Sequence, residues 1–204
     1  MRNRILVLSL FVFLASCAMS ETRIYSLYLP NPSAPSLTAG DTKGASGGTN
    51  GKDNAAVIVL VSSPKYLSQP YIALRSSPYQ LTVSRYSKWD SSPDEIVQSA
   101  LKQSLCRGLF KEVRISHTVP TGFYSLKIDL KKFERSDEGA LAYGEVAFEV
   151  NLISPDGKNL YEKNIVKRTQ LADRSFVSLA KGLSSILGEG VDEVRGDIEK
   201  TVSH

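Results

Sequence analysis

The stretch Glu145–Arg168, EVAFEVNLISPDGKNLYEKNIVKR, decides the class of fold. Its first half alternates apolar and polar residues, and the apolar set is Val146, Phe148, Val150 and Leu152. This period of two is typical of a strand with one buried face. Turn-forming residues follow at Ser154-Pro155-Asp156-Gly157, and a second strand is predicted at Leu160–Arg168. The stretch therefore predicts an antiparallel hairpin, with Lys163 and Lys167 marking its second strand as a sheet edge.

Further strands are predicted on the N-terminal side of this hairpin. Tyr124–Lys132 shows the same alternation, which leaves one face in water. Ala55–Val61 is a continuous Val/Ile/Leu run, as expected of a central strand covered on both faces. Shorter strands are predicted at Arg23–Leu29, Tyr71–Arg75, Leu81–Trp89 and Val113–Thr118. A turn at residues 76–78 joins two of them as a second hairpin.

Two amphipathic helices complete the predicted elements. The first begins with Ser92 as its cap and Pro93 at its first position, and Glu95 is placed to reach back to the cap amide. It is expected to end at about Gly108. The second runs from Ser175 to Thr201, with Gly188 and Gly190 as positions of a kink. Together these elements predict an α+β fold, a mostly antiparallel sheet with two amphipathic helices packed on one face.

The first residues have the pattern of a bacterial lipobox. Arg2 and Arg4 precede the apolar run Ile5–Ala15, which ends in Leu14-Ala15-Ser16-Cys17. The run is too short to span a bilayer, so residues 1–16 are expected to be a cleaved lipoprotein signal peptide and Cys17 the site of lipid attachment. Residues 17–21 are then an acylated tether and residues 22–204 a single domain. The alternative is an ordinary signal peptide that contains a cysteine.

Residues 30–54 are predicted to form a flexible loop. They contain five glycines and three prolines, and they have too little apolar surface to offset the entropy cost of ordering. The segment Gly47–Lys52 lacks the spacing of a phosphate-binding loop, and Asp53 stands where that motif needs Ser or Thr. Nucleotide binding is therefore rejected.

Charge and cysteine content exclude further classes of protein. Processing removes two of the 25 basic residues and none of the 21 acidic ones, so half of the formal charge of +4 belongs to the signal peptide. The rest has no basic cluster, and nucleic-acid binding is not expected. Only Cys17 and Cys106 remain, so acylation leaves no disulfide, and Cys106 is predicted to be buried or half-buried and inert. No later apolar run is long enough for a membrane helix, so the membrane contact is the lipid alone.

The chain offers no recognisable catalytic or metal site. Its two histidines are His117, predicted within a short strand, and the terminal His204. They and one free cysteine cannot supply the ligands of a zinc site. No Gly-x-Ser-x-Gly nucleophile elbow joins a predicted strand to a predicted helix, and the carboxylate pairs Asp94-Glu95 and Asp192-Glu193 fall in or near helical turns, where solvent or the helix dipole accounts for them. We therefore expect no enzyme, no cofactor and no metal.

Three segments of the first half of the chain form a further pattern: Tyr25-Ser26-Leu27, VIVLVSSPKYLSQPYIALR (57–75) and YSKWDSSPDEIVQSALKQSL (86–105). Together they resemble the ABC-type transport auxiliary lipoproteins of the paraquat-inducible protein C type. The positions that carry the resemblance are Pro64, Tyr66, Leu67, Pro70, Arg75 and Trp89. The resemblance covers the anchor and the first half of the chain, whereas the second half is similar in layout alone.

The resemblance implies an accessory lipoprotein that works with a mammalian-cell-entry-type protein, a permease and an ATPase to move lipid between the two membranes of a diderm envelope. Ala18 is not the aspartate that retains many lipoproteins at the inner membrane, so we expect an outer-membrane location facing the periplasm. One alternative is an outer-membrane assembly lipoprotein that plugs or chaperones a barrel. Another is a lipid-carrying protein, which would need an internal apolar cavity. The oligomeric state stays open, with a homo-oligomer among the options.

The partner is expected to contact the segment Pro64–Arg75 and the nearby sheet edge. Two prolines remove amides from a strand edge, and Tyr66, Tyr71 and Arg75 are of the residue types enriched in binding hot spots. Trp89 is assigned to the same surface. The alternative is that these residues shape and fill the sheet edge, and for Trp89 this alternative is favoured.

Replacing Cys17 with alanine is expected to release the protein from membranes, because the thiol is the only predicted attachment point. The measurement is membrane fractionation with incorporation of labelled fatty acid, followed by a sucrose gradient for the parent protein. An unchanged membrane fraction in the variant, together with no label in the parent, would contradict the anchor. Recovery of the parent wholly in the inner membrane would contradict the expected location.

Overall fold

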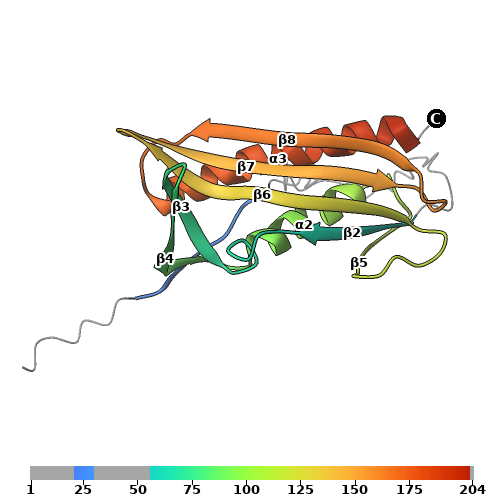
Figure 1. The fold of residues 1–204 in the computed structure, drawn as a ribbon, viewed down its shortest axis with the longest axis horizontal. Coiled ribbons are helices and arrows are strands. Elements are labelled where there is room, and N and C mark those ends of the chain that lie inside the picture. Colours follow the sequence, from blue (N-terminus) through green and yellow to red (C-terminus); the bar gives the residue numbers. More distant parts are fainter. Residues whose placement is uncertain (1–20, 30–55, 203–204) are drawn as a thin grey trace, which may run out of the picture.

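The computed structural model describes residues 21–29 and 56–202, and within them it confirms the α+β fold (Figure 1). An eight-stranded sheet carries two helices on one of its faces. The elements in chain order are β1 (Arg23–Tyr25), β2 (Ala56–Ser62), β3 (Tyr71–Ser77), β4 (Gln80–Trp89), α2 (Pro93–Leu105), β5 (Glu112–Ile115), β6 (Tyr124–Glu138), β7 (Leu141–Ile153), β8 (Asn159–Gln170) and α3 (Phe176–Val202).

The hairpin predicted from the alternating pattern is the pair β7–β8, and β6 extends it into a three-stranded antiparallel meander. The turn closes with a hydrogen bond of 3.0 Å from the Gly157 amide to the Ser154 carbonyl. Gly157 has a φ of +85°, a conformation that a residue with a Cβ rarely adopts. β8 forms the sheet edge, as predicted, but Lys163 and Lys167 point to the helix side, where they pair with acidic residues of α3.

The other edge of β6 is shared by two strands placed end to end. β2 pairs in parallel with the first part of β6, from Tyr124 to Asp129, and β3 pairs in parallel with the later part, from Glu134 to Ser136. Beyond β2 lies β5, and beyond β3 lie β4 and then β1. The sheet is therefore antiparallel along its longest strands and parallel where the shorter N-terminal strands join.

Both helices lie side by side on the same face of the sheet, as predicted (Figure 1). The Ser92 amide donates to the Glu95 carboxylate at 3.1 Å, so the predicted cap interaction is present. α2 ends at Leu105, earlier than the predicted Gly108. α3 continues through Gly188 and Gly190 without interruption.

The core lies between the sheet and the two helices. Its largest fully buried side chains include Trp89, Phe133, Phe148, Leu101 and Leu130. A Cβ added at Gly190 would lie 3.1 Å from Ile165 and 3.5 Å from Phe148. This glycine therefore allows α3 to approach β7 and β8 closely, which is its role in place of the predicted kink.

Two sequence predictions differ from the structure in detail. Cys106 is exposed, not buried, because α2 ends at the residue before it and the side chain leaves the packed stripe. β5 ends at Ile115, so His117 lies exposed in the following loop and not in a strand. Cys17, the predicted loop at residues 30–54 and His204 lie outside the described residues.

Replacing Gly196 with alanine is expected to stabilise the protein by about 0.5–1 kcal/mol. Gly196 lies inside α3, and a Cβ added there meets nothing within 4 Å, so the helix gains propensity without a clash. The measurement is the free energy of unfolding in urea. Gly182→Ala is the matched control, because its Cβ would lie 2.7 Å from Leu171 and 3.1 Å from Thr169. Equal stabilisation by both variants would contradict this account of the two glycines.

Candidate functional site

The segment that connects β2 and β3 fills the space between these two strands along the edge of β6. Leu67 is fully buried there, and its amide donates to the Pro64 carbonyl at 2.8 Å. The Trp89 amide donates to the Pro70 carbonyl at 2.7 Å, which fixes the end of β4 to the same segment. The segment Pro64–Pro70 is therefore folded tightly against the sheet.

Glu134 of β6 is the polar centre of this junction. The neighbouring Phe133 pairs with Val146 and lies in the core on the helix side of the sheet. Successive side chains of a strand point to opposite faces, so Glu134 lies on the face opposite the helices, where it is fully buried. The Arg75 guanidinium donates two hydrogen bonds to its carboxylate, one of them at 3.2 Å. The Tyr66 hydroxyl donates to the same carboxylate at 3.4 Å and lies 3.3 Å from the Lys131 carbonyl. These contacts connect the segment and β3 to β6.

The electrostatics of the cluster follow from these contacts. Burial, and then the negative charge of Glu134, raises the pKa of Tyr66 to about 12. The hydrogen bond to Glu134 raises the pKa of Arg75 above its ordinary value. Tyr66 therefore stays protonated and Arg75 charged at any physiological pH, which is the state that a buried carboxylate needs in its partners.

The remaining two predicted contact residues differ from each other. Trp89 is 2% exposed and packs edge-to-face on Phe133 at a ring separation of 5.7 Å, so it fills the core as the alternative interpretation held. Tyr71 is half-buried, and the Lys88 ammonium lies 5.2 Å from its ring centre. The structure thus brings Tyr66 and Arg75 together around Glu134, whereas Tyr71 presents its ring at the surface of the hairpin β3–β4.

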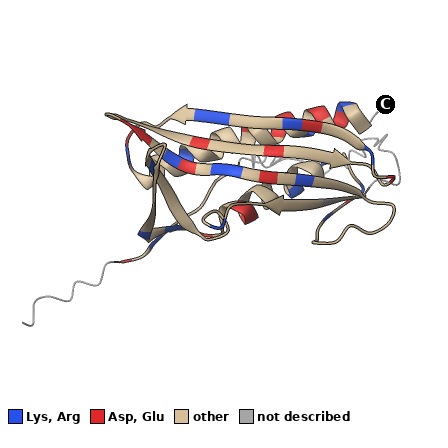
Figure 2. Ribbon diagram, viewed as in Figure 1, with Lys and Arg blue, Asp and Glu red and all other residues tan. Residues whose placement is uncertain are grey.

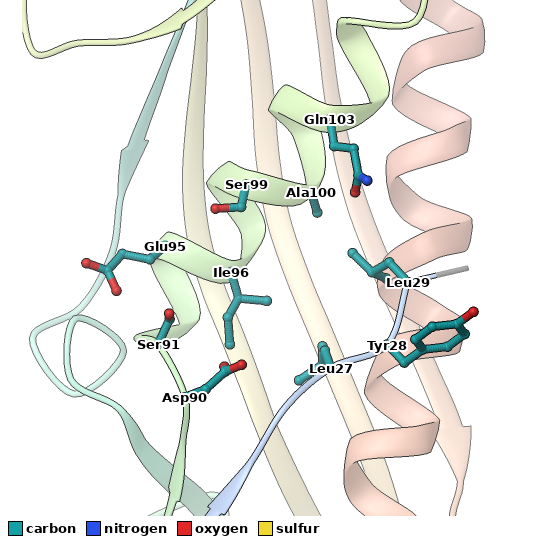
Figure 3. Close-up of a pocket in the computed structure, with 10 residues that line it drawn as sticks. All are labelled: Leu27, Tyr28, Leu29, Asp90, Ser91, Glu95, Ile96, Ser99, Ala100 and Gln103. Carbon is teal, nitrogen blue, oxygen red and sulfur yellow. The ribbon is translucent and has the colours of Figure 1, made fainter. Parts of the chain in front are cut away.

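A second candidate region lies on the helix side and was not predicted from the sequence. Residues Ser26–Leu29, here called the strap, follow β1 and run between α2 and α3 (Figure 3). The Tyr28 amide donates to the Ser184 hydroxyl at 3.0 Å, and this hydroxyl donates to the Ala180 carbonyl at 2.6 Å. The predicted strand Arg23–Leu29 was too long, because only its first three residues pair with β4.

Hollows lie on both sides of the strap. The hollow on the α2 side measures about 330 Å³, with Leu27 and Leu29 facing Ile96 and Ala100 across it (Figure 3). A second, of about 250 Å³, lies between the two helices beyond Leu29. The largest measures about 530 Å³, and it lies on the α3 side between the strap and the start of that helix. The hollows of 330 and 530 Å³ fall within the size range of small-molecule sites, and all three lie at the surface of the domain.

Charged residues on the open face of the sheet neutralise each other. Figure 2 shows bands of both signs along β6 and β8, and acidic bands along β7 between them. Glu145 pairs with Lys132 at 2.8 Å and with Arg168 at 3.4 Å, and Glu149 pairs with Lys131 at 3.5 Å. Partly exposed pairs of this kind contribute little stability.

The described residues hold no group of three or more His, Cys, Asp or Glu side chains that would bind a metal ion. Over the same residues, neither helix is both long and apolar enough to cross a membrane. The features with the character of a site are thus the Glu134 junction, the ring of Tyr71 and the hollows beside the strap.

The model of one protein family, described as the ABC-type transport auxiliary lipoprotein component, matches residues 36–195. The chain belongs to this family. The resemblance drawn from Pro64, Tyr66, Leu67, Pro70, Arg75 and Trp89 is therefore confirmed, and the structure shows that all six build or flank the Glu134 junction.

Solved structures share the fold of this auxiliary lipoprotein. Protein XCC0632 from Xanthomonas campestris matches with a TM-score of 0.69 and 17% identity, over 88% of this chain and 96% of that one. A structure described only as an uncharacterized protein matches with a TM-score of 0.61 and 13% identity, over 87% and 99% of the two chains. A comparison with curated proteins finds no match. At these identities the likeness shows the fold and nothing about partners.

Replacing Arg75 with methionine is expected to destabilise this auxiliary lipoprotein by about 3 kcal/mol, because it leaves the buried Glu134 carboxylate without its charged partner. Adding Glu134→Gln to the variant is expected to recover part of the loss. The measurement is urea unfolding of the parent, both single variants and the double variant. Additive effects of the two substitutions would contradict the coupling.

Proposed function

We propose that this protein is the envelope-side accessory lipoprotein of an ABC-type system that moves lipid between the two membranes of a diderm cell. In this proposal it acts by binding a mammalian-cell-entry-type protein of that system. The observation that carries the proposal is the family match over residues 36–195. An auxiliary transport subunit needs an attachment and a contact surface, so the proposal assigns the chain no catalytic residue, cofactor or metal.

The attachment in this proposal is the lipid on Cys17, in the outer membrane and facing the periplasm. β1 begins at Arg23, six residues after Cys17. A fully extended chain covers at most ~3.6 Å per residue, so the start of the domain at Arg23 lies within about 20 Å of the lipid-bearing Cys17. This short distance supports a protein that works at the membrane surface.

The proposed contact surface is the part of the β3–β4 hairpin around Tyr71. Of the four residues assigned to the partner, Tyr66 and Arg75 bond to Glu134 and Trp89 is buried, whereas the Tyr71 ring lies at the surface beside Lys88. Residues 55–89, which contain this hairpin, include no Asp or Glu. A tyrosine ring at the surface is of a residue type that is enriched in interface hot spots.

The test is copurification of envelope proteins with the tagged protein after mild detergent extraction. We expect a mammalian-cell-entry-type protein with the parent and a several-fold loss of it with Tyr71→Ser. Tyr143→Ser is the matched control, because Tyr143 is also a half-buried sheet tyrosine beneath a cation, with Arg168 at 3.7 Å. Unfolding curves of both variants verify that the fold is retained.

Other results of the copurification would favour another function or another contact surface. A barrel protein in place of the transport protein would favour the outer-membrane assembly class. Copurified lipid without any protein partner would favour a lipid carrier. Retention of the transport protein by Tyr71→Ser at the level of Tyr143→Ser would remove the hairpin from the contact surface while leaving the function in place.

A further inference from the structure

We propose that a surface formed by β1, the strap and the first turns of α3 lies against the lipid bilayer and contacts anionic phospholipid headgroups. The surface, here called the β1–α3 patch, is defined by Ile24, Tyr28 and Val177 with the cations Arg23 and Lys181. The proposal rests on the lipid attachment at Cys17 proposed above, and it adds which side of the domain faces the membrane.

The first observation is a cluster of exposed apolar side chains. Tyr28 is 77% exposed, Ile24 69% and Val177 53%. All three line the 530 Å³ hollow between the strap and α3, so they form one continuous surface and not scattered exposures. Soluble domains rarely leave such a cluster without a partner, and tyrosine is enriched where protein meets the membrane–water interface.

The second observation is that the fold holds this patch in place. β1 pairs with β4, and the Tyr25 ring packs edge-to-face on Phe176 at 5.6 Å, which ties the strand to the start of α3. The Tyr28 amide is fixed by the Ser184 hydroxyl. The exposed rings and chains are therefore presented by a rigid backbone, as an interface with a flat surface requires.

The third observation is the distribution of charge. The residues of the patch lie in two segments, 22–29 and 174–188. These segments contain Arg23, Arg174 and Lys181 but no Asp or Glu. Glu21 and Asp173 lie just outside these two segments. The acidic residues of α3 begin at Glu189, and Figure 2 shows them in the half of the helix that is remote from β1. Cations near an anionic membrane surface each contribute about 1 kcal/mol of attraction.

The fourth observation is the place of the patch in the chain. Arg23 and Ile24 begin the first described strand after the tether, and at most about 25 Å separates them from Cys17. The patch and the lipid therefore lie at the same end of the domain. A bilayer is the surface that this end meets first, which favours the membrane over a second protein as the occupant.

The test places a tryptophan in the patch of the full, acylated protein reconstituted in vesicles of dibrominated phosphatidylcholine and phosphatidylglycerol. Tyr28→Trp keeps the backbone bond to Ser184, and the native Trp89 is buried and supplies a constant background. Leu160→Trp is the control, since Leu160 is 38% exposed at the start of β8, at the opposite end of the sheet from β1 (Figure 1).

Emission of Tyr28→Trp is expected to fall by about two-fold in brominated vesicles, because an interfacial side chain reaches the boundary of the acyl region. Leu160→Trp and the parent are expected to keep their emission. Adding Lys181→Glu to Tyr28→Trp, or raising the salt concentration, is expected to reduce the quenching.

Flotation of the same vesicles separates the two levels of the proposal. The membrane contact of the patch is overturned if the protein floats with the vesicles but Tyr28→Trp loses no more emission in brominated vesicles than Leu160→Trp does. The anchor would still stand. The patch would then be free for a protein partner. Protein that does not float overturns the anchor and, with it, this proposal.

Discussion

The burial of one carboxylate, Glu134, holds the two halves of the sheet together. One edge of β6 pairs with β7 along its whole length, and the other edge pairs with both β2 and β3. The chain between those strands would leave a gap if it did not fold down onto β6. A charge without solvent needs a charged and hydrogen-bonded partner. Arg75 provides these contacts from β3 and Tyr66 from the segment in the gap, so the positions of the segment and of β3 depend on each other.

Much of the fold follows from local pattern. The alternation in Tyr124–Lys132 and Glu145–Ile153 predicted strands with one buried face, and the turn after the second one predicted the hairpin β7–β8. Ser92 with Glu95 predicted the start of α2. Each signal depends on neighbours within a few residues, which is why it can be read from one sequence. The parallel pairing of β2 and β3 on β6 joins residues more than fifty positions apart, and no local pattern records it. The sharing of one edge of β6 by β2 and β3 was therefore seen only in the structure.

The candidate site was harder to predict for a chemical reason. Tyrosine and arginine are enriched both in binding hot spots and around buried carboxylates, because a hydroxyl and a guanidinium satisfy either setting. The sequence around Tyr66 and Arg75 cannot distinguish the two, since the decisive residue, Glu134, lies on another strand. Trp89 was assigned to the same surface, but its burial agrees with the alternative interpretation, that its bulk fills the fold. The strap carried a weak signal in Leu27 and Leu29, which continue the apolar pattern of β1 beyond its paired residues.

The shared edge of β6 also sets the order in which the chain is able to fold. β2 is synthesised long before β6 and lacks its main partner until residues 124–138 are available, whereas β3 pairs with β4 and waits only for its contact with β6. The meander of β6, β7 and β8 has local contacts and is expected to form first, whereas docking of the N-terminal strands closes long loops and is slow. An apolar strand such as β2 stays unpaired during that interval. In the proposed export of this chain, which would cross a membrane before it folds, β2 would need protection from aggregation during this delay.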